Sequence, residues 1–152
     1  MGGLSILKHT VVIKAPAGFV FEQLSTPSAR ESWTKEIQSI QYEHPSEEKT
    51  EGAAFIQVQK EGAIRTSFHG KNVAVIEPET YSYSLESKAF KMVISYHLED
   101  LQGETKVTQT YETIYLSPFA KIMGTLSSKL TGKLALSLLH QLKRYCENSL
   151  IK

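Results

Sequence analysis

The fold is decided by residues 5–33, which read SILKHTVVIKAPAGFVFEQLSTPSARESW. The first ten residues of this stretch are rich in β-branched side chains and end at an Ala-Pro pair, where Pro16 interrupts strand hydrogen bonding. An apolar helical turn follows, and a second short helix can begin at Pro27, which suits the first helical position, with Thr26 as its cap. These features predict one strand and two short helices, over residues 5–14, 18–24 and 27–33.

Beyond the short helices, apolar and polar residues alternate in runs that are typical of strands. The first run covers residues 36–43, and the polar stretch 44–52 after it is expected to be a loop. Later runs are separated by short connections such as Glu61-Gly62, which is the spacing of antiparallel neighbours. The later strands are predicted over residues 53–60, 64–76, 80–87, 90–99 and 104–116.

Ser117-Pro118 begins the last predicted element, a helix that runs to about residue 148. Serine suits the N-cap position and proline the first helical position. The apolar stripe in the second half of this helix is rotated away from the stripe in the first half. Thr131-Gly132 lies between the halves, and glycine is a poor helix former, so we expect a kink or a break there.

The composition is that of an ordinary globular protein. The chain has 152 residues, the usual size of one domain, so one domain over residues 1–152 is expected. Hydrophobic residues make up 41% and charged residues 22%, which favours neither disorder nor a fibrous class. Because 17 basic side chains nearly balance 16 acidic ones, no overall field attracts nucleic acid, which is not an expected partner.

The sequence favours a cytoplasmic location. Its single cysteine, Cys146, excludes an intramolecular disulfide and fits a reducing compartment. No stretch approaches the ~20 apolar residues of a membrane span. The final helix is locally basic, since residues 117–146 contain no acid, and it could make transient contact with an anionic membrane surface. A helix that is buried on one face would explain the same pattern.

Three segments resemble motifs of the START-like, or SRPBCC, superfamily. Residues 13–16 (Ile-Lys-Ala-Pro) with 20–21 (Val-Phe) resemble its opening signature, and residues 27–33 resemble its second helix, which carries Pro and Trp. Residues 142–147 are similar to the common Leu-Lys-x-x-x-Glu ending. Thr26 stands where the family often has aspartate, but threonine also caps helices. The resemblance covers almost the whole chain, and the bacterial polyketide cyclase/dehydrase and lipid-transport group is the nearest match.

This resemblance implies an α+β helix-grip fold, in which a curved antiparallel sheet of about seven strands wraps around the long C-terminal helix. A bent sheet cannot press its whole concave face against one helix, so a cavity is expected between them. Alternate strand residues face inward, and we choose the register by apolar content. The predicted ligand-binding residues are His9, Val11, Trp33, Phe55, Phe68, Tyr81, Tyr83, Ile94, Tyr96, Gln109 and Tyr111, with Met123, Leu126 and Leu130 from the helix.

Little in the sequence points to catalysis. The five histidines are scattered, with no metal-ligand spacing, and there is no Gly-x-Ser-x-Gly elbow, phosphate loop or dinucleotide fingerprint. Neither a metal nor a cofactor is therefore expected. The favoured hypothesis is binding, transport or sensing of a small hydrophobic molecule, such as a lipid, an isoprenoid or an aromatic polyketide-like compound, by a monomer or a homodimer.

Two alternatives remain open. Resemblance to the aromatic polyketide cyclases implies an enzyme whose pocket folds a reactive chain, with His9, Tyr96 and Tyr111 as candidates for proton transfer. Resemblance to co-chaperone domains of the same fold implies an interaction module that docks through an exposed patch. One scaffold hosts many functions, so the fold alone does not decide between them.

Overall fold

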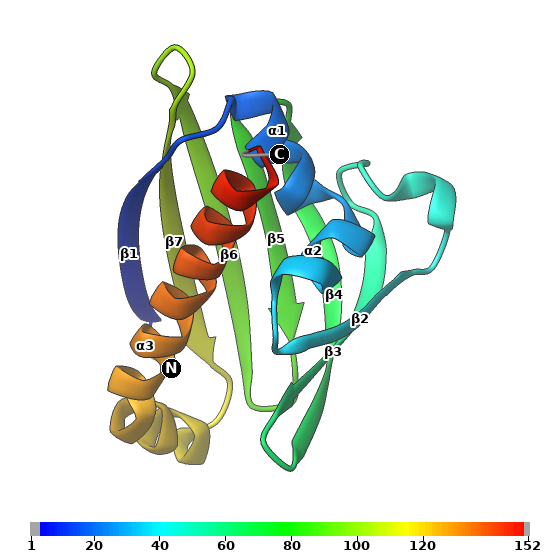
Figure 1. Cartoon of the computed structure of the whole chain (residues 1–152). Helices are drawn as coiled ribbons and strands as arrows, with labels where there is room; N and C mark the ends of the chain where they lie inside the picture. Colours follow the sequence, from blue (N-terminus) through cyan, green and yellow to red (C-terminus); the bar gives the residue numbers. More distant parts are fainter. Residues whose placement is uncertain (1–3, 151–152) are drawn as a thin grey trace.

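A curved antiparallel sheet and a long C-terminal helix dominate the structure, which is a computed structural model (Figure 1). It describes the backbone of residues 4–150, and the side chains in this range apart from 4, 5, 61 and 119–131. The described elements are β1 (Leu4–Ile13), α1 (Ala17–Ser25), α2 (Pro27–Trp33), β2 (Ile37–Tyr42), the 3-10 helix η1 (Pro45–Glu47), β3 (Ala54–Glu61), β4 (Ile64–Ile76), β5 (Thr80–Glu86), β6 (Phe90–Asp100), β7 (Thr105–Tyr115) and α3 (Pro118–Ser149).

The sheet has the strand order β1-β7-β6-β5-β4-β3-β2, and all its pairs are antiparallel. Five of the six pairs join strands that are consecutive in the sequence, as the short connections predicted. The sixth pair is β1 with β7, which brings the two ends of the strand region together. The helix-grip fold is thereby confirmed, and the predicted strands agree with the observed ones to within a few residues.

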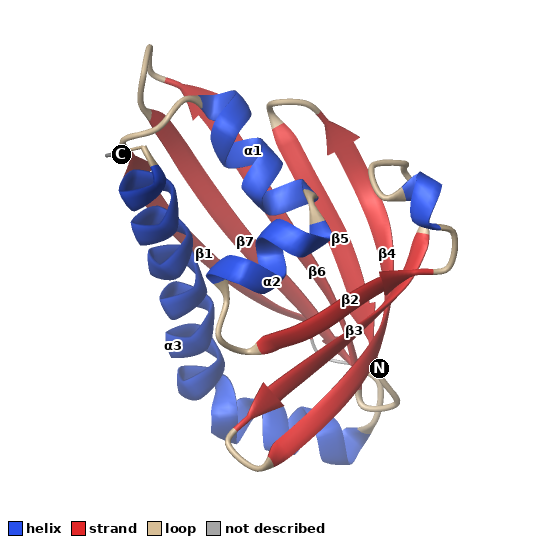
Figure 2. Cartoon of the chain, turned by 45° about the vertical axis from the view of Figure 1, so that its right-hand side comes forward, coloured by secondary structure: helices blue, strands red, loops and turns tan. Residues whose placement is uncertain are grey.

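The helices lie on one side of the sheet. Figure 2 shows α1 and α2 beside the C-terminal half of α3, over the concave face. Helix α3 continues without interruption across Thr131-Gly132, so the structure contains no break there. Its ribbon nevertheless changes direction in the first half, between the turns at the bottom of Figure 2 and the longer part that rises along the sheet. In the described range, no helix is both long and apolar enough to cross a bilayer.

The core lies between the concave face and the helices. Strand β7 buries alternate residues from Thr105 to Thr113, on the face chosen for it from the sequence. In β5 every residue from Tyr81 to Leu85 is buried, because neighbouring strands cover its small outward serines as well. The largest fully buried hydrophobic side chains are those of Ile13, Val20, Phe21, Leu24, Tyr81, Leu85, Ile94, Val107, Leu139 and Leu142.

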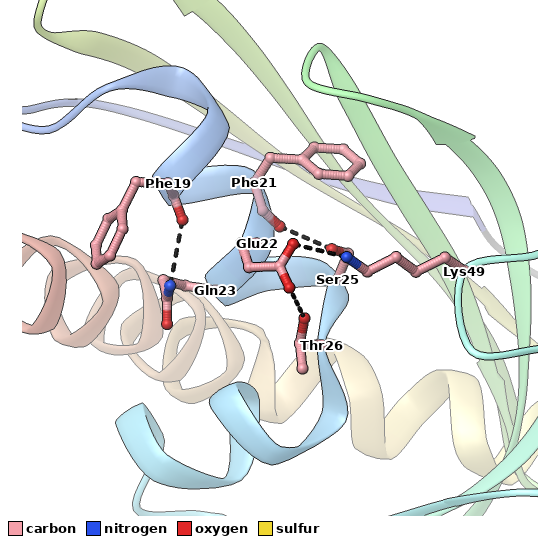
Figure 3. Close-up of polar contacts among 7 residues, drawn as sticks. All are labelled: Phe19, Phe21, Glu22, Gln23, Ser25, Thr26 and Lys49. Atoms are coloured by element: carbon pink, nitrogen blue, oxygen red, sulfur yellow. Dashed lines mark hydrogen bonds and ion pairs between the residues drawn. The ribbon is translucent and has the colours of Figure 1, made fainter. Parts of the chain in front are cut away.

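A network of polar contacts links α1 to the loop between β2 and β3 (Figure 3). The Glu22 carboxylate accepts hydrogen bonds from Lys49 Nζ at 2.6 Å and from Thr26 Oγ1 at 2.9 Å. Thr26 is the N-cap residue of α2, as predicted, but its side chain makes no capping hydrogen bond. The predicted position of the cap is therefore right, but the predicted capping hydrogen bond is wrong, because the Thr26 hydroxyl donates to Glu22, one helical turn earlier.

The C-terminal end of α3 is attached to the end of β1. Lys143 Nζ donates to the Val12 carbonyl oxygen and to Glu147 Oε2, both at 2.7 Å. The same Glu147 oxygen accepts a hydrogen bond from the Lys14 amide at 2.9 Å. These two donors hold the pKa of Glu147 below its ordinary value of 4.5. The contact fixes where α3 crosses the edge of the sheet.

We expect this attachment to make stability depend on pH. A carboxyl whose pKa is lower in the folded protein stabilises the fold above the unfolded pKa and loses that contribution as the pH falls through the folded pKa. Glu147→Gln should therefore lower the melting temperature at pH 7, and the difference from wild type should shrink as the pH falls below 4.5. Thermal unfolding from pH 7 to pH 3 measures this, with the exposed Glu104→Gln as control. Parallel profiles for wild type and Glu147→Gln would contradict it.

Gly70 is required by the close approach of an aromatic ring. It pairs with Phe55 across β3 and β4, and a Cβ atom at position 70 would overlap the Phe55 ring. That ring cannot move freely, since it is 2% exposed and lies 5.0 Å from the Tyr42 ring, measured between centroids. Residue 70 must therefore lack a side chain.

Gly70→Ala should destabilise the protein by about 1–3 kcal/mol, because it overpacks a region that has no free space. Chemical denaturation of this variant, beside the exposed neighbour His69→Ala, measures the effect. Equal unfolding midpoints for Gly70→Ala and wild type would show that the ring can shift at no cost.

Candidate functional site

A cavity of about 720 Å³ lies between the concave face of the sheet and α3. Its size falls within the roughly 300–1,000 Å³ of pockets that hold small molecules. Strands β2 to β7, the connection from α2 to β2, and α3 all contribute side chains to it. Most of its wall is apolar, formed by Ile37, Phe68, Leu85, Phe90, Met92, Ile94, Leu134 and Leu138.

The polar side chains that line the cavity differ in their exposure to solvent. Four of them are buried or half-buried along the wall. The three lysines are exposed, like Gly62, and Glu36 is half-buried. The wall residues are Gln57, Gln59, Tyr83 and Tyr111, and the charged residues are Lys35, Glu36, Lys60 and Lys133.

A buried cation, Arg30, lies behind this wall. The side chain comes from α2 and is only 3% exposed. Its Nη2 donates to Gln57 Oε1 at 2.9 Å, and its Cζ lies 4.2 Å from the centre of the Tyr83 ring. A cation–π contact and a charge-assisted hydrogen bond offset part of the cost of burying the charge. Gln57 and Tyr83 thus separate Arg30 from the cavity while remaining in contact with both.

Arg30 stays charged in this environment. Burial by itself lowers the pKa of the guanidinium, but interactions with the surrounding tyrosines, chiefly Tyr83 and Tyr81, raise it above its ordinary value. Among the described side chains, no carboxylate forms an ion pair with it. Sequence reasoning missed this residue, because in a short polar helix an arginine looks like a solvated surface side chain.

The buried tyrosines differ in what their hydroxyls contact. Tyr81 and Tyr42 both donate to Asn72 Oδ1, at 3.1 Å and 2.8 Å. Within the described part of the chain, the Tyr111 hydroxyl makes no hydrogen bond, although its side chain lines the cavity. It is therefore available to donate to, or accept from, a molecule in the cavity.

Burial raises the pKa of Tyr111, and also those of Tyr81, Tyr83 and Tyr96. All four phenols consequently remain protonated at neutral pH, which makes them hydrogen-bond donors and poor bases. Cys146 is fully buried, and burial raises its pKa to about 12, so it supplies no thiolate at neutral pH. In the described ranges, no three potential metal-ligating side chains lie together.

His9 and Tyr96 are joined through an amide. His9 Nδ1 lies 3.3 Å from Gln109 Oε1, and Gln109 Nε2 donates to the Tyr96 hydroxyl at 3.2 Å. Neither His9 nor Tyr96 lines the cavity, whereas Tyr111 does. Of the three candidates for proton transfer, His9 and Tyr96 are therefore joined by hydrogen bonds through Gln109, and Tyr111 belongs to the cavity wall.

The other predicted ligand-binding residues are also divided. Phe68, Tyr83, Ile94 and Tyr111 line the cavity. Val11 is half-buried outside the lining, and Trp33 packs beneath α1, where its Nε1 donates to the Gln23 carbonyl at 2.9 Å. Phe55, Tyr81, Tyr96 and Gln109 are buried outside the lining. The side chains of Met123, Leu126 and Leu130 lie outside the described residues.

Sequence reasoning named none of the charged lining residues. Gln57 could have been found, because it alternates with Phe55 and so faces inward in the same strand. Leu134 and Leu138 belong to the apolar stripe in the second half of the helix, but the helix residues predicted to bind a ligand all came from the first half. No pattern in the sequence links Lys35 to Lys60 or Lys133, since only the folded chain brings their segments to one opening.

With this geometry in view, comparison with known proteins gives a family. Residues 6–147 match the model of the family described as polyketide cyclase/dehydrase and lipid transport. The chain belongs to this family. A search of curated proteins finds no match.

Solved structures share the fold of this family member at low sequence identity. A START superfamily protein from Mycobacterium smegmatis has a TM-score of 0.76 and 17% identity, with 96% of this chain and 99% of that one covered. An aromatase/cyclase from Streptomyces sp. R1128 has a TM-score of 0.74 and 13% identity, with 95% and 94% covered. Norcoclaurine synthase from Thalictrum flavum has a TM-score of 0.71 and 10% identity, with 98% of both covered. These structures confirm the fold that the resemblance to the START-like superfamily implied.

The contact between Gln57 and Arg30 should be important for stability. Gln57→Leu removes the acceptor of the Arg30 hydrogen bond and leaves a buried charged donor with one partner fewer. Loss of such a bond costs about 1–3 kcal/mol. Urea denaturation measures it, with Gln41→Leu, at an exposed position of β2, as the control. If both variants unfold at the wild-type midpoint, the guanidinium does not depend on this amide.

Proposed function

We propose that this family member binds a small, largely apolar molecule in the cavity, either to carry it or to sense it. The observation that supports this most strongly is the cavity itself, about 720 Å³ with mainly apolar walls. Burying an apolar ligand there removes hydrocarbon surface of both the ligand and the cavity wall from water. Each Å² of apolar surface buried contributes roughly 25 cal/mol to the free energy of binding. The family description, which includes lipid transport, agrees with the proposal.

The wall can also orient a ligand. The Tyr111 hydroxyl is free to form a hydrogen bond, and Gln59 presents an amide whose oxygen accepts from Gln57 Nε2 at 2.8 Å. These groups favour a ligand with one or two polar atoms over a pure hydrocarbon. A lipid, an isoprenoid and an aromatic polyketide-like compound all meet this description.

Polyketide cyclase-like catalysis has weaker support. Burial raises the pKa of Tyr111, so the phenol stays protonated at neutral pH and is a weaker acid than an exposed tyrosine. His9 is hydrogen-bonded to Gln109 outside the cavity lining. Membrane contact through the basic helix also has weaker support, since Lys143 is already bonded to Val12 and Glu147.

The proposal is tested with N-phenyl-1-naphthylamine, an uncharged dye that fluoresces in apolar surroundings. We expect the protein to bind it and expect Met92→Trp, which fills the cavity from β6, to reduce binding at least tenfold. Val93→Trp is the matched control, because Val93 is the next residue of the same strand and does not line the cavity. Melting temperatures of both variants show whether they are folded.

Native mass spectrometry of the freshly purified protein complements the dye. A bound apolar compound that is lost from Met92→Trp and retained by Val93→Trp would support the proposal. Equal dye binding by wild type and Met92→Trp, both folded, would contradict it.

A further inference from the structure

Three lysines surround the solvent end of the cavity. Lys35 lies between α2 and β2, Lys60 is near the end of β3, and Lys133 is on α3. All three are exposed, whereas the apolar wall residues around them are buried or half-buried. Figure 2 shows the start of β2 and the end of β3 both lying toward α3. The fold thus gathers three positive charges from segments that are distant in sequence.

Among the described residues, no carboxylate forms an ion pair with any of the three lysines. Glu36 is the one carboxylate among the described lining residues. One of its oxygens is instead buried without a hydrogen-bond partner. Arg30 adds a further positive charge behind Gln57. Positive charges beside low-dielectric walls concentrate the field inside a cleft and attract anions to it.

The cavity below the lysines is suited to hydrocarbon. Phe68, Phe90 and Leu134 belong to the apolar wall, and among the described lining residues the charged side chains are limited to the three lysines and Glu36. A molecule that is apolar at one end and anionic at the other can therefore satisfy both regions at once. A neutral apolar molecule gains no attraction from the lysines, which water hydrates in its presence. A small inorganic anion gains none of the free energy of burying apolar surface.

We propose that the natural ligand is an amphipathic anion, with its apolar body in the cavity and a carboxylate or similar anionic group among Lys35, Lys60 and Lys133. This inference rests on the proposed function and specifies the ligand class for the same site. Each exposed lysine contributes modestly, since water and salt screen its charge. Three of them acting on one group are expected to discriminate between charged and neutral heads.

Decanoate and 1-decanol test this inference, because they share a chain length and differ in the charge of the head. Each compound competes with N-phenyl-1-naphthylamine at pH 7.5 in low salt. The triple variant Lys35→Gln/Lys60→Gln/Lys133→Gln should bind decanoate about tenfold more weakly than the wild type, because the small attractions of the three lysines add up. Its affinity for decanol should equal that of the wild type. Glu36→Gln should bind decanoate about two- to fivefold more tightly.

A second triple variant, Lys71→Gln/Lys91→Gln/Lys106→Gln, is the matched control. It loses the same net charge from exposed strand positions outside the cavity lining. Decanoate should bind it as it binds the wild type, and about 1 M salt should remove the difference between the two triple variants.

The outcomes separate this inference from the proposed function. If both triple variants bind decanoate equally, the anion is not recognised at the cavity opening and the inference is wrong, while decanol binding would leave the proposed function intact. If the wild type binds neither compound nor the dye, the proposed function and the inference both fail.

Discussion

The pairing of β1 with β7 is the constraint on which the rest of the structure depends. Because the first strand returns to the last one, the connection from β1 to β2 must cross the concave side, and α1 and α2 form that crossing. Helix α3 follows β7 directly and is attached to β1 through Lys143 and Glu147. The sheet edge therefore positions every helix, and the helices cover only part of the curved face.

The cavity follows from the same geometry. The long helix crosses the curved seven-stranded sheet near its β1 edge, and α1 and α2 cover part of the remaining concave face. Near α1 and α2 large residues such as Phe21 and Tyr81 fill the space over this face, and their rings pack edge to face with centroids 6.3 Å apart. Farther along α3, Lys133 and Leu134 line the cavity.

Much of this architecture could be predicted from the sequence, and the reasons are local. The Ala-Pro at the end of β1, the proline that begins α2 and the period-two pattern of β7 each act within a few residues, so they can be read one at a time. The burial of Arg30 could not be predicted, since it depends on Gln57 and Tyr83, which come from distant strands. Thr26 illustrates a third case, in which the position of a cap was predictable but the choice of Glu22 as its hydroxyl's partner was not.

Replacing a lysine at the cavity opening costs less folding stability than replacing an apolar residue of the wall. An exposed lysine can become neutral or acidic with little effect on folding, whereas Leu85 or Ile94 cannot be changed without leaving a void or a clash. Under the proposed recognition of an amphipathic anion, the preference for a ligand's charge and the stability of the fold depend on separate residues. Related chains with the same core could therefore diverge in the molecules they accept by drift at three surface positions, while the hydrocarbon chamber beneath them stays the same.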